Sequence, residues 1–207
     1  MLKKTILLVL LFAVTVAAQV ATSRPYPIDN AHSTVGFTVP ILGGLSQVTG
    51  KFNDYAITLN VDEKDITKSS VSVVIKATSI DTGIERRDVH LRNADFFDVE
   101  KYPEITFKSE RIEKKGKQFI AHGPLTMHGV TKQIALPFTV TGTYKNPGNN
   151  KTSVGYSAKV VLNRRDFGIN YSRQDNPTFI GDNITVEIEL VTRALDPQPA
   201  ADTKSTN

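Results

Sequence analysis

Alternation of apolar and polar side chains, with a period of two residues, is the sequence feature that most constrains the fold. The alternation is regular in residues 133–144 and 184–190, whose apolar positions are Ile134, Leu136, Phe138, Val140 and Tyr144, then Ile184, Val186, Ile188 and Leu190. A strand with this pattern has one apolar face and one wetted face, which is typical of antiparallel sheets. The alternation therefore predicts an all-β protein.

The same pattern predicts about eight strands. They are expected in residues 34–41, 47–61, 70–79, 104–108, 119–127, 133–144, 153–163 and 184–191. Turn-forming residues separate several of them, at 114–117, 127–130 and 146–150. One short helical segment is expected in residues 82–93.

Strand length favours a barrel over two packed sheets. At ~3.3 Å per residue, residues 133–144 span ~40 Å, well beyond the usual strand of about five or six residues. An eight-stranded barrel either holds a ligand or is filled by its own side chains. The small residues Ala121, Gly123 and Ala158 on the expected inward face are compatible with interior room, and equally with space for a neighbouring aromatic ring.

Both ends of the chain are expected to lie outside the folded domain. Residues 1–18 place Lys3 and Lys4 before an apolar run that ends in small residues, which is the pattern of a cleaved signal peptide. The run is too short to span a membrane and no Cys follows it, so we expect no membrane anchor. Residues 196–207 lack large apolar side chains and are expected to form a disordered tail. Residues 24–195 would then form one domain of a periplasmic or secreted protein.

Several functional classes lack the residues that they need. The formal net charge of +4 includes Lys3 and Lys4, and the other basic residues alternate with acidic ones, so no nucleic-acid partner is expected. The four histidines form no metal-binding motif, and the chain has neither Cys nor a G-x-S-x-G sequence. The sequence therefore predicts no catalytic residue, no metal and no cofactor.

Arginines in two segments raise two alternatives. One segment is the helical one, with Arg86, Arg87 and Arg92, and the other holds Arg164 and Arg165. The guanidinium fork suits a polar or phosphorylated head group, which makes Arg87, Arg92 and Arg165 candidates for binding one. The alternative, which we favour, is a network with Asp88 and Asp166 that holds the helix against the barrel end.

Nine segments, in their order and spacing, carry a family resemblance. They are HSTVGF (32–37), VTGKF (48–52), SIDTG (79–83), RDVHL (87–91), DFFD (95–98), YPEITF (102–107), GPLTMHGVTK (123–132), NRRDFGI (163–169) and IGD (180–182). Together they resemble the YceI family of bacterial exported proteins. The resemblance implies an extended, lipocalin-like barrel that encloses a polyisoprenoid or similar amphiphile and has no enzyme activity. It carries over no ligand-binding residue.

The sequence and the resemblance together define an expected function and site. We expect non-catalytic binding of a polyisoprenoid, an isoprenoid quinone or a fatty-acid derivative, for transport, storage or stress protection. The expected apolar lining is Phe37, Val73, Ile75, Ile105, Phe107, Leu125, Phe138, Val140, Tyr156, Val160 and Ile188. Two alternatives are an enzyme acting on a small hydrophobic substrate and a closed barrel that acts through its surface in stress. A homodimer stays open.

Overall fold

The structure, a computed structural model, describes residues 23–196. The expected signal peptide (1–18) lies outside the described residues, as does the expected tail except for its first residue, Asp196. That residue is held to the barrel, because its carboxylate pairs with Lys151 at 3.2 Å and its carbonyl accepts a hydrogen bond from Arg24.

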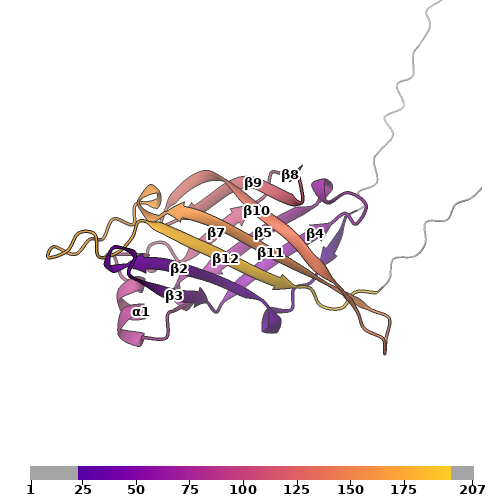
Figure 1. Cartoon of the computed structure of the whole chain (residues 1–207), viewed down its shortest axis with the longest axis horizontal. Helices are drawn as coiled ribbons and strands as arrows, with labels where there is room; N and C mark the ends of the chain where they lie inside the picture. The colour runs from indigo at the N-terminus through magenta and orange to yellow at the C-terminus, as the bar shows by residue number, and fades with distance from the viewer. Residues whose placement is uncertain (1–22, 197–207) are drawn as a thin grey trace, which may run out of the picture.

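The described chain folds into one curled antiparallel sheet of twelve strands (Figure 1). Its strands are β1 (Arg24–Tyr26), β2 (Thr34–Ile41), β3 (Ser46–Phe52), β4 (Tyr55–Val61), β5 (Ser70–Lys76), β6 (Ile80–Asp81), β7 (Glu104–Lys108), β8 (Arg111–Lys115), β9 (Gln118–Met127), β10 (Val130–Lys145), β11 (Thr152–Asn163) and β12 (Asn183–Val191). The α-helix α1 (Glu85–Arg92) lies at one end of the curled sheet. Short 3-10 helices are η1 (Asn30–His32), η2 (Leu42–Gly44), η3 (Ile66–Lys68), η4 (Ala77–Ser79) and η5 (Arg164–Phe167).

The predicted fold class, an antiparallel barrel with one short helical segment, is confirmed, but the strand count is corrected from about eight to twelve. Residues 47–61 form two strands, because the chain bends at Asn53 and Asp54. The sequence analysis also missed β1 and β6, which are three and two residues long, and β8. In β8 only Ile112 is apolar, so the strand has no alternation to detect.

The sheet wraps around so that its two edges meet along a seam. Its order is β1-β4-β5-β7-β9-β10-β11-β12-β2-β3-β6, with β8 paired to β9. At one end, β5 continues through η4 into β6, which pairs with β3. At the other end, a bridge between Ile28 and Thr192 joins the chain after β1 to the chain after β12. No ladder joins β3 to β4 within residues 23–196, and there the hydroxyl of Tyr55 donates to the carbonyl of Ser33 at 2.9 Å.

The inward faces of the strands form two apolar clusters. The larger one includes Val35, Phe52, Ile80 and Phe107, and lies in the half of the barrel that carries α1. The smaller one includes Tyr156, and its other buried members are Tyr26, Ile28, Leu59, Val61 and Leu190. Because alternate residues of a strand face the same side, the period-two apolar positions supply both clusters.

Strand β10 is longer than expected and leaves the barrel at its far end. It covers Val130–Lys145, where residues 133–144 were predicted, and its end projects with β11 as a hairpin (Figure 1). The pairing of β10 with β9 ends at Phe138 and Phe119, and a bulge follows between Val140 and Gly142. Val140 has therefore lost one neighbouring strand and is 38% exposed, so its expected position in the apolar lining is corrected.

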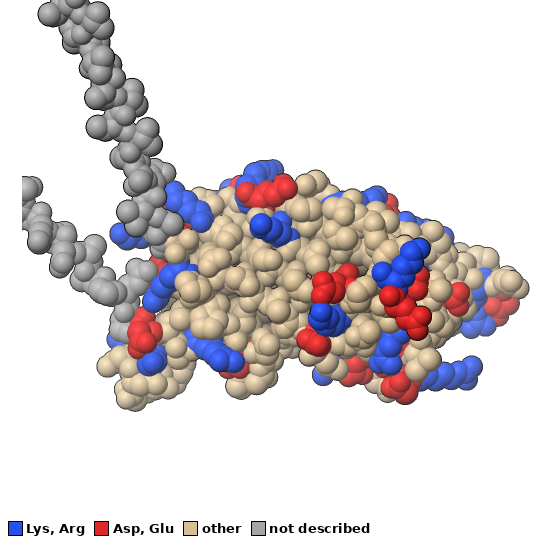
Figure 2. All heavy atoms as spheres, turned by 180° about the vertical axis from the view of Figure 1, so that it is seen from behind, with Lys and Arg blue, Asp and Glu red and all other residues tan. Residues whose placement is uncertain are grey.

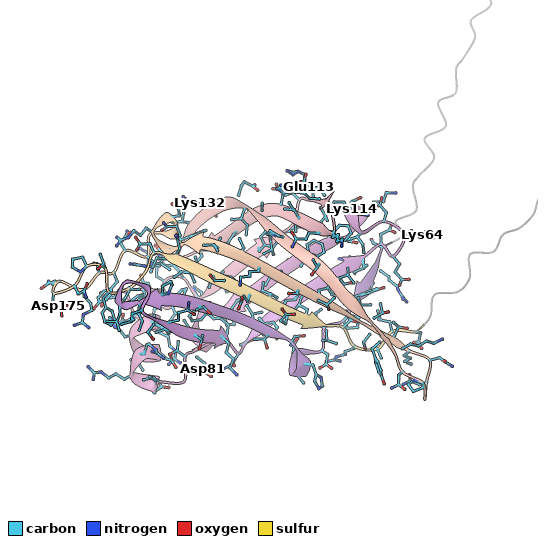
Figure 3. The ribbon with its side chains drawn as sticks, viewed as in Figure 1. Lys64, Asp81, Glu113, Lys114, Lys132 and Asp175 are labelled. Atoms are coloured by element: carbon cyan, nitrogen blue, oxygen red, sulfur yellow. The ribbon has the colours of Figure 1, made fainter. Side chains whose placement is uncertain are left out.

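Charged side chains lie on the outside of the barrel. Figure 3 shows this for Lys64, Glu113, Lys114 and Lys132, and Figure 2 shows acidic and basic groups side by side on the opposite face. Several form ion pairs across neighbouring strands, such as Lys76 with Glu104 and Lys159 with Glu187. Within residues 23–196, no helix is long and apolar enough to cross a membrane.

Candidate functional site

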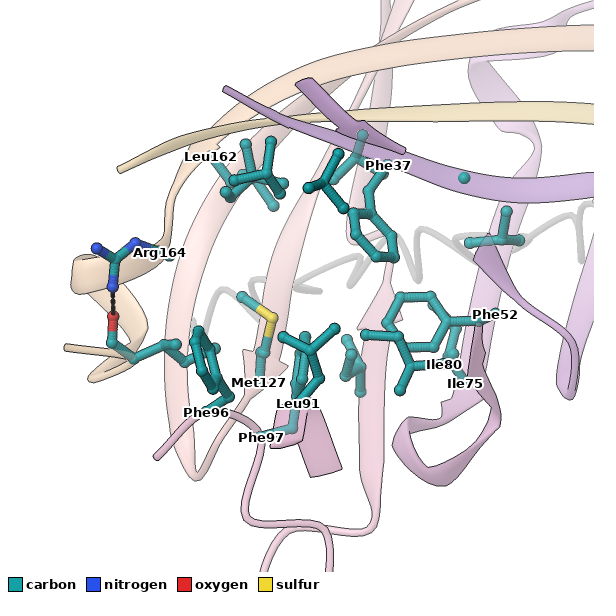
Figure 4. A pocket seen from close by; sticks show the side chains of 18 of the residues that line it. Phe37, Phe52, Ile75, Ile80, Leu91, Phe96, Phe97, Met127, Leu162 and Arg164 are labelled. Carbon is teal, nitrogen blue, oxygen red and sulfur yellow. Dashed lines mark hydrogen bonds between the residues drawn. The ribbon is translucent and has the colours of Figure 1, made fainter. Parts of the chain in front are cut away.

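A cavity of about 480 Å³ occupies the half of the barrel that carries α1. Its volume lies in the range of small-molecule pockets, which is roughly 300–1,000 Å³. Eight strands, α1 and residues 169–180 contribute to its lining. Figure 4 shows Phe37 and Leu162 on one side of this space and Leu91 and Phe97 on the other. We refer to it as the large cavity.

The wall of the large cavity holds eight of the eleven residues that the sequence analysis assigned to an apolar lining. They are Phe37, Val73, Ile75, Ile105, Phe107, Leu125, Val160 and Ile188. Strand register explains why several are neighbours: Phe107 on β7 lies opposite Val73 on β5 and opposite Leu125 on β9. Residues that pair directly across strands project from the same face of the sheet.

A second cavity of about 70 Å³, the small cavity, lies in the other half of the barrel. Phe138 and Tyr156 line it, as predicted, and Val73 and Ile188 line both cavities. Val140 lines neither. Burial raises the pKa of the Tyr156 phenol well above its ordinary value, so this hydroxyl keeps its proton.

The small residues of the inward face serve two different purposes. Ala121 and Ala158 line the small cavity, where their short side chains leave room. Gly123 instead allows a close approach of the backbone, since a Cβ atom there would lie 2.0 Å from the carbonyl oxygen of Lys108. Neither of the two explanations offered by the sequence applies to Gly123.

The sequence analysis left out many lining residues. Leu136 and Ile134 share the alternation of Phe138, and Val35, Val39 and Ile41 share that of Phe37, so the pattern could have found them. Others come from segments without such a period, namely Leu91, Phe96 and Phe97 on or after α1 and Ile169, Tyr171, Arg173, Phe179 and Ile180 before β12. No local pattern in the sequence marks these last residues.

Polar side chains line the large cavity at the end that carries α1. They are Arg87, His90, Arg164, Tyr171 and Arg173. Of the three arginines proposed for a head group, Arg87 lines the cavity, although its guanidinium also donates to the hydroxyl of Thr82 at 2.7 Å and to its carbonyl at 2.9 Å. The remaining donors of Arg87 are its capacity for a ligand.

The other two arginines do not line either cavity, which corrects their expected place in the site. Arg92 donates to the carbonyl oxygens of Thr78 at 3.0 Å and Ile80 at 3.1 Å, and so ties α1 to the β5–β6 connection. Arg165 pairs with Asp182 at 2.8 Å. Both side chains therefore hold structure together at this end of the barrel.

The expected network of arginines with Asp88 and Asp166 is also corrected. Asp88 is buried and accepts hydrogen bonds from the backbone N–H and the hydroxyl of Thr82, just before α1. Asp166 pairs with Lys132 at 3.1 Å. The acid that serves the arginines is Asp182, which lies next to Arg164 and Arg165.

Arg164 is a buried cation at the edge of the large cavity (Figure 4). Its Nε and Nη1 atoms donate to the carbonyl oxygens of Gly181 at 3.2 Å and Ile169 at 2.7 Å. Burial lowers the pKa of Arg164, and the carboxylate of Asp182 opposes this shift. Arg164 thus fixes residues 169–181 against the end of β11.

Three rings close the end of the large cavity near α1. The ring centroids of His90 and Tyr171 are 5.0 Å apart, and both rings contact Phe96, at 5.0 Å and 4.8 Å respectively. The Nε2 atom of His90 lies 2.8 Å from a carboxylate oxygen of Asp95. This aromatic cluster (His90, Phe96 and Tyr171) packs the segment before β12 against α1.

The arrangement favours packing of an apolar guest over chemistry on it. Within the described range 23–196, no three His, Asp or Glu side chains come together in a way that could hold a metal ion. The polar groups at the cavity end already hold partners: His90 has Asp95, Arg87 has Thr82 and Arg173 has Asp175. Such groups can orient a polar head while the aliphatic wall takes an apolar chain.

Comparison with known proteins identifies the family of this fold and site. The YceI-like domain model matches residues 26–192. A UPF0312 protein of Photorhabdus laumondii is 34% identical over 193 residues, which cover 92% of this chain and 98% of the relative.

Two solved structures share the fold. BcnA of Burkholderia cenocepacia superposes with a TM-score of 0.70 at 21% identity, over 79% of this chain and 98% of BcnA. A polyisoprenoid-binding domain of Saccharophagus degradans, implicated in plant cell wall breakdown, superposes with a TM-score of 0.57 at 16% identity, over 82% and 98%. With a family model that spans the barrel from β1 to the end of β12, this chain belongs to the YceI family.

Proposed function

We propose that this protein binds one long amphiphilic lipid, such as a polyisoprenoid, an isoprenoid quinone or a fatty-acid derivative, without chemically changing it. The observation that carries the proposal is the large cavity, whose wall is apolar along the barrel and whose polar side chains gather at one end. An apolar chain would lie along the wall, with its head group near Arg87, His90 and Arg173.

The driving force would be burial of the chain. Each buried CH₂ group contributes about 0.8 kcal/mol before the costs of association. Arg87 and Arg173 retain donors for a polar or phosphorylated head, and a charged head group would gain charge-assisted hydrogen bonds there. The Saccharophagus degradans domain, which shares the fold, is described as polyisoprenoid-binding and supports this ligand class.

Two alternatives are less well supported. A closed barrel that acts through its surface would be filled by its own side chains, whereas this barrel contains about 480 Å³ of space. An enzyme needs a positioned general acid, base or nucleophile beside the substrate. At the polar end of the cavity, His90 and Arg87 are instead engaged with Asp95 and Thr82.

We further propose that binding takes place outside the cytoplasm. The features that support export are Lys3 and Lys4, the apolar run after them, and the small residues Ala17 and Ala18. In the periplasm or after secretion, a protein of this kind would carry, store or protect a lipid that water does not dissolve.

Native mass spectrometry of the purified protein, followed by organic extraction, tests the proposal. A reproducible added mass that extracts as a lipid is the expected result, and apo protein that stays free of lipid after incubation with lipid mixtures would contradict it. Leu91→Arg should abolish loading, because it puts an unpaired charge against the cavity without altering the barrel wall. Phe107→Arg should do the same from the wall, and Thr106→Arg, on the other face of β7, is its matched control. Thermal melting confirms that each variant folds.

A further inference from the structure

Three aliphatic side chains separate the large cavity from the small one. Val73, Leu136 and Ile188 are the residues that line both cavities. They come from β5, β10 and β12, which are not neighbours: β7 and β9 lie between β5 and β10, and β11 lies between β10 and β12. The three side chains therefore approach the middle of the barrel from different parts of its wall. We call them the partition.

The partition is a barrier of volume only. Its side chains have no hydrogen-bonding groups, so nothing but packing fixes their rotamers. Leu136 and Ile188 are only partly buried, which leaves them room to move, while Val73 is buried. A flexible chain end can displace side chains of this kind, whereas a rigid fused-ring lipid is too wide to pass between them.

Space beyond the partition is small and apolar. The small cavity holds about 70 Å³, and Ala121, Ala158 and Leu190 are among its lining residues. Since a water molecule takes about 30 Å³ in the liquid, the small cavity has room for only a few carbon atoms. It can therefore receive the end of a chain but not a second ligand.

We propose that the partition sets the length and shape of the ligand: the large cavity takes the head and most of the chain, and the small cavity takes the chain end after it displaces Leu136 and Ile188. This inference rests on the proposed function and deepens it. The ligand class is a linear, flexible chain, such as an isoprenoid, that just extends past the partition.

Binding of a series of isoprenoid alcohols tests the inference. Geraniol, farnesol and geranylgeraniol have the same head group and increasing chain length, and displacement of a fluorescent apolar dye gives their affinities. In the unaltered protein the affinity should rise by about tenfold at the step where the chain end enters the small cavity. Cholesterol should bind at least about tenfold more weakly than the longest alcohol.

Variants on each side of the partition make the test specific. Ala158→Leu fills the small cavity without touching the large one, and should weaken the longest alcohol about tenfold while the shortest stays within about twofold. Val73→Ala should open the partition and favour the longest alcohol. Ile75→Ala is the matched control, because Ile75 lies two residues further along β5 and lines only the large cavity, so all lengths should change alike.

Two failures are distinguishable. If none of the alcohols, nor cholesterol, binds the unaltered protein, the proposed lipid-binding function fails. If they bind but Ala158→Leu affects all lengths equally or none, the partition has no role in selecting length, and the inference is overturned while lipid binding stands.

Discussion

Arg164 Nη2 lies 2.8 Å from Asp182 Oδ1, beside the polar end of the large cavity, and the two atoms are not aligned for a hydrogen bond. Charge therefore holds this pair, while the other donors of Arg164 serve the carbonyls of Gly181 and Ile169. Arg164→Lys should lower the free energy of unfolding by about 1–3 kcal/mol, because one ammonium group cannot satisfy both buried carbonyls. Urea unfolding measures the change.

Arg165→Lys is the control for that substitution. Arg165 pairs with the same carboxylate at 2.8 Å, but its side chain is 41% exposed. Exposed ion pairs contribute about 0–1 kcal/mol, so this variant should stay close to the unaltered protein. Equal losses in both variants would show that charge alone, and not the buried carbonyl bonds, matters at this position.

Tyr171 is expected to control how fast a ligand leaves. Its ring contacts His90 and Phe96 and holds residues 169–180 against α1. An aromatic pair is worth about 0.5–1.5 kcal/mol, so Tyr171→Ala should raise the dissociation rate constant roughly three- to thirtyfold. Stopped-flow displacement measures it, with Tyr144→Ala in the projecting hairpin as the control. An unchanged rate would place the exit elsewhere.

Gly50 gives the Phe37 ring its place in the cavity wall. A Cβ atom at Gly50 would lie 2.4 Å from the Phe37 ring, which must then move. Gly50→Ala should cost about 1–3 kcal/mol of stability and weaken lipid binding. At Gly36 the nearest neighbour of an added Cβ lies at an ordinary 3.6 Å, so Gly36→Ala should leave binding unchanged. Matched titrations of both variants decide the point.

The Tyr26–Glu63 pair predicts a pH dependence of stability at both ends of the scale. The hydroxyl of Tyr26 donates to Glu63 at 2.6 Å, which with Arg24 lowers the pKa of Glu63. Burial and this same hydrogen bond raise the pKa of Tyr26 to about 12.

The sign of each effect follows from linkage. A lowered carboxyl pKa stabilises the fold above its ordinary value of 4.5, and this stabilisation is lost as the pH falls through the lowered value. A raised phenol pKa stabilises the fold below 10, and this is lost as the pH rises toward 12. Tyr26→Phe should reduce both dependences in urea unfolding at a series of pH values. Parallel profiles for the variant and the unaltered protein would contradict the assignment.

Alternation in the sequence predicts most of the barrel wall, because residue parity along a paired strand fixes the face of each side chain. Ile75, Phe107 and Ile188 line a cavity for this reason alone. Parity fails at Val140, since β9 ends before it and no second strand covers it there. Exposure at that position depends on the length of a neighbour, which the local sequence does not encode.

The polar end of the site was the least predictable part. Arg92 and Arg165 find their partners at Thr78, Ile80 and Asp182, and only the fold brings these residues together. Residues 169–180 have no regular period, so nothing in their sequence places Tyr171 against His90. The glycine at position 123 likewise acts through a contact with Lys108, on another part of the chain.

The seam between β3 and β4 makes the barrel unequally stiff around its circumference. Across the paired strands, a change in girth would break backbone hydrogen bonds, whereas at the seam the Tyr55–Ser33 hydrogen bond and side-chain packing hold the wall. A guest wider than the resting cavity would therefore expand the molecule in one direction. The barrel behaves as a cuff with a single fastening, and the residues next to that fastening set how far it yields.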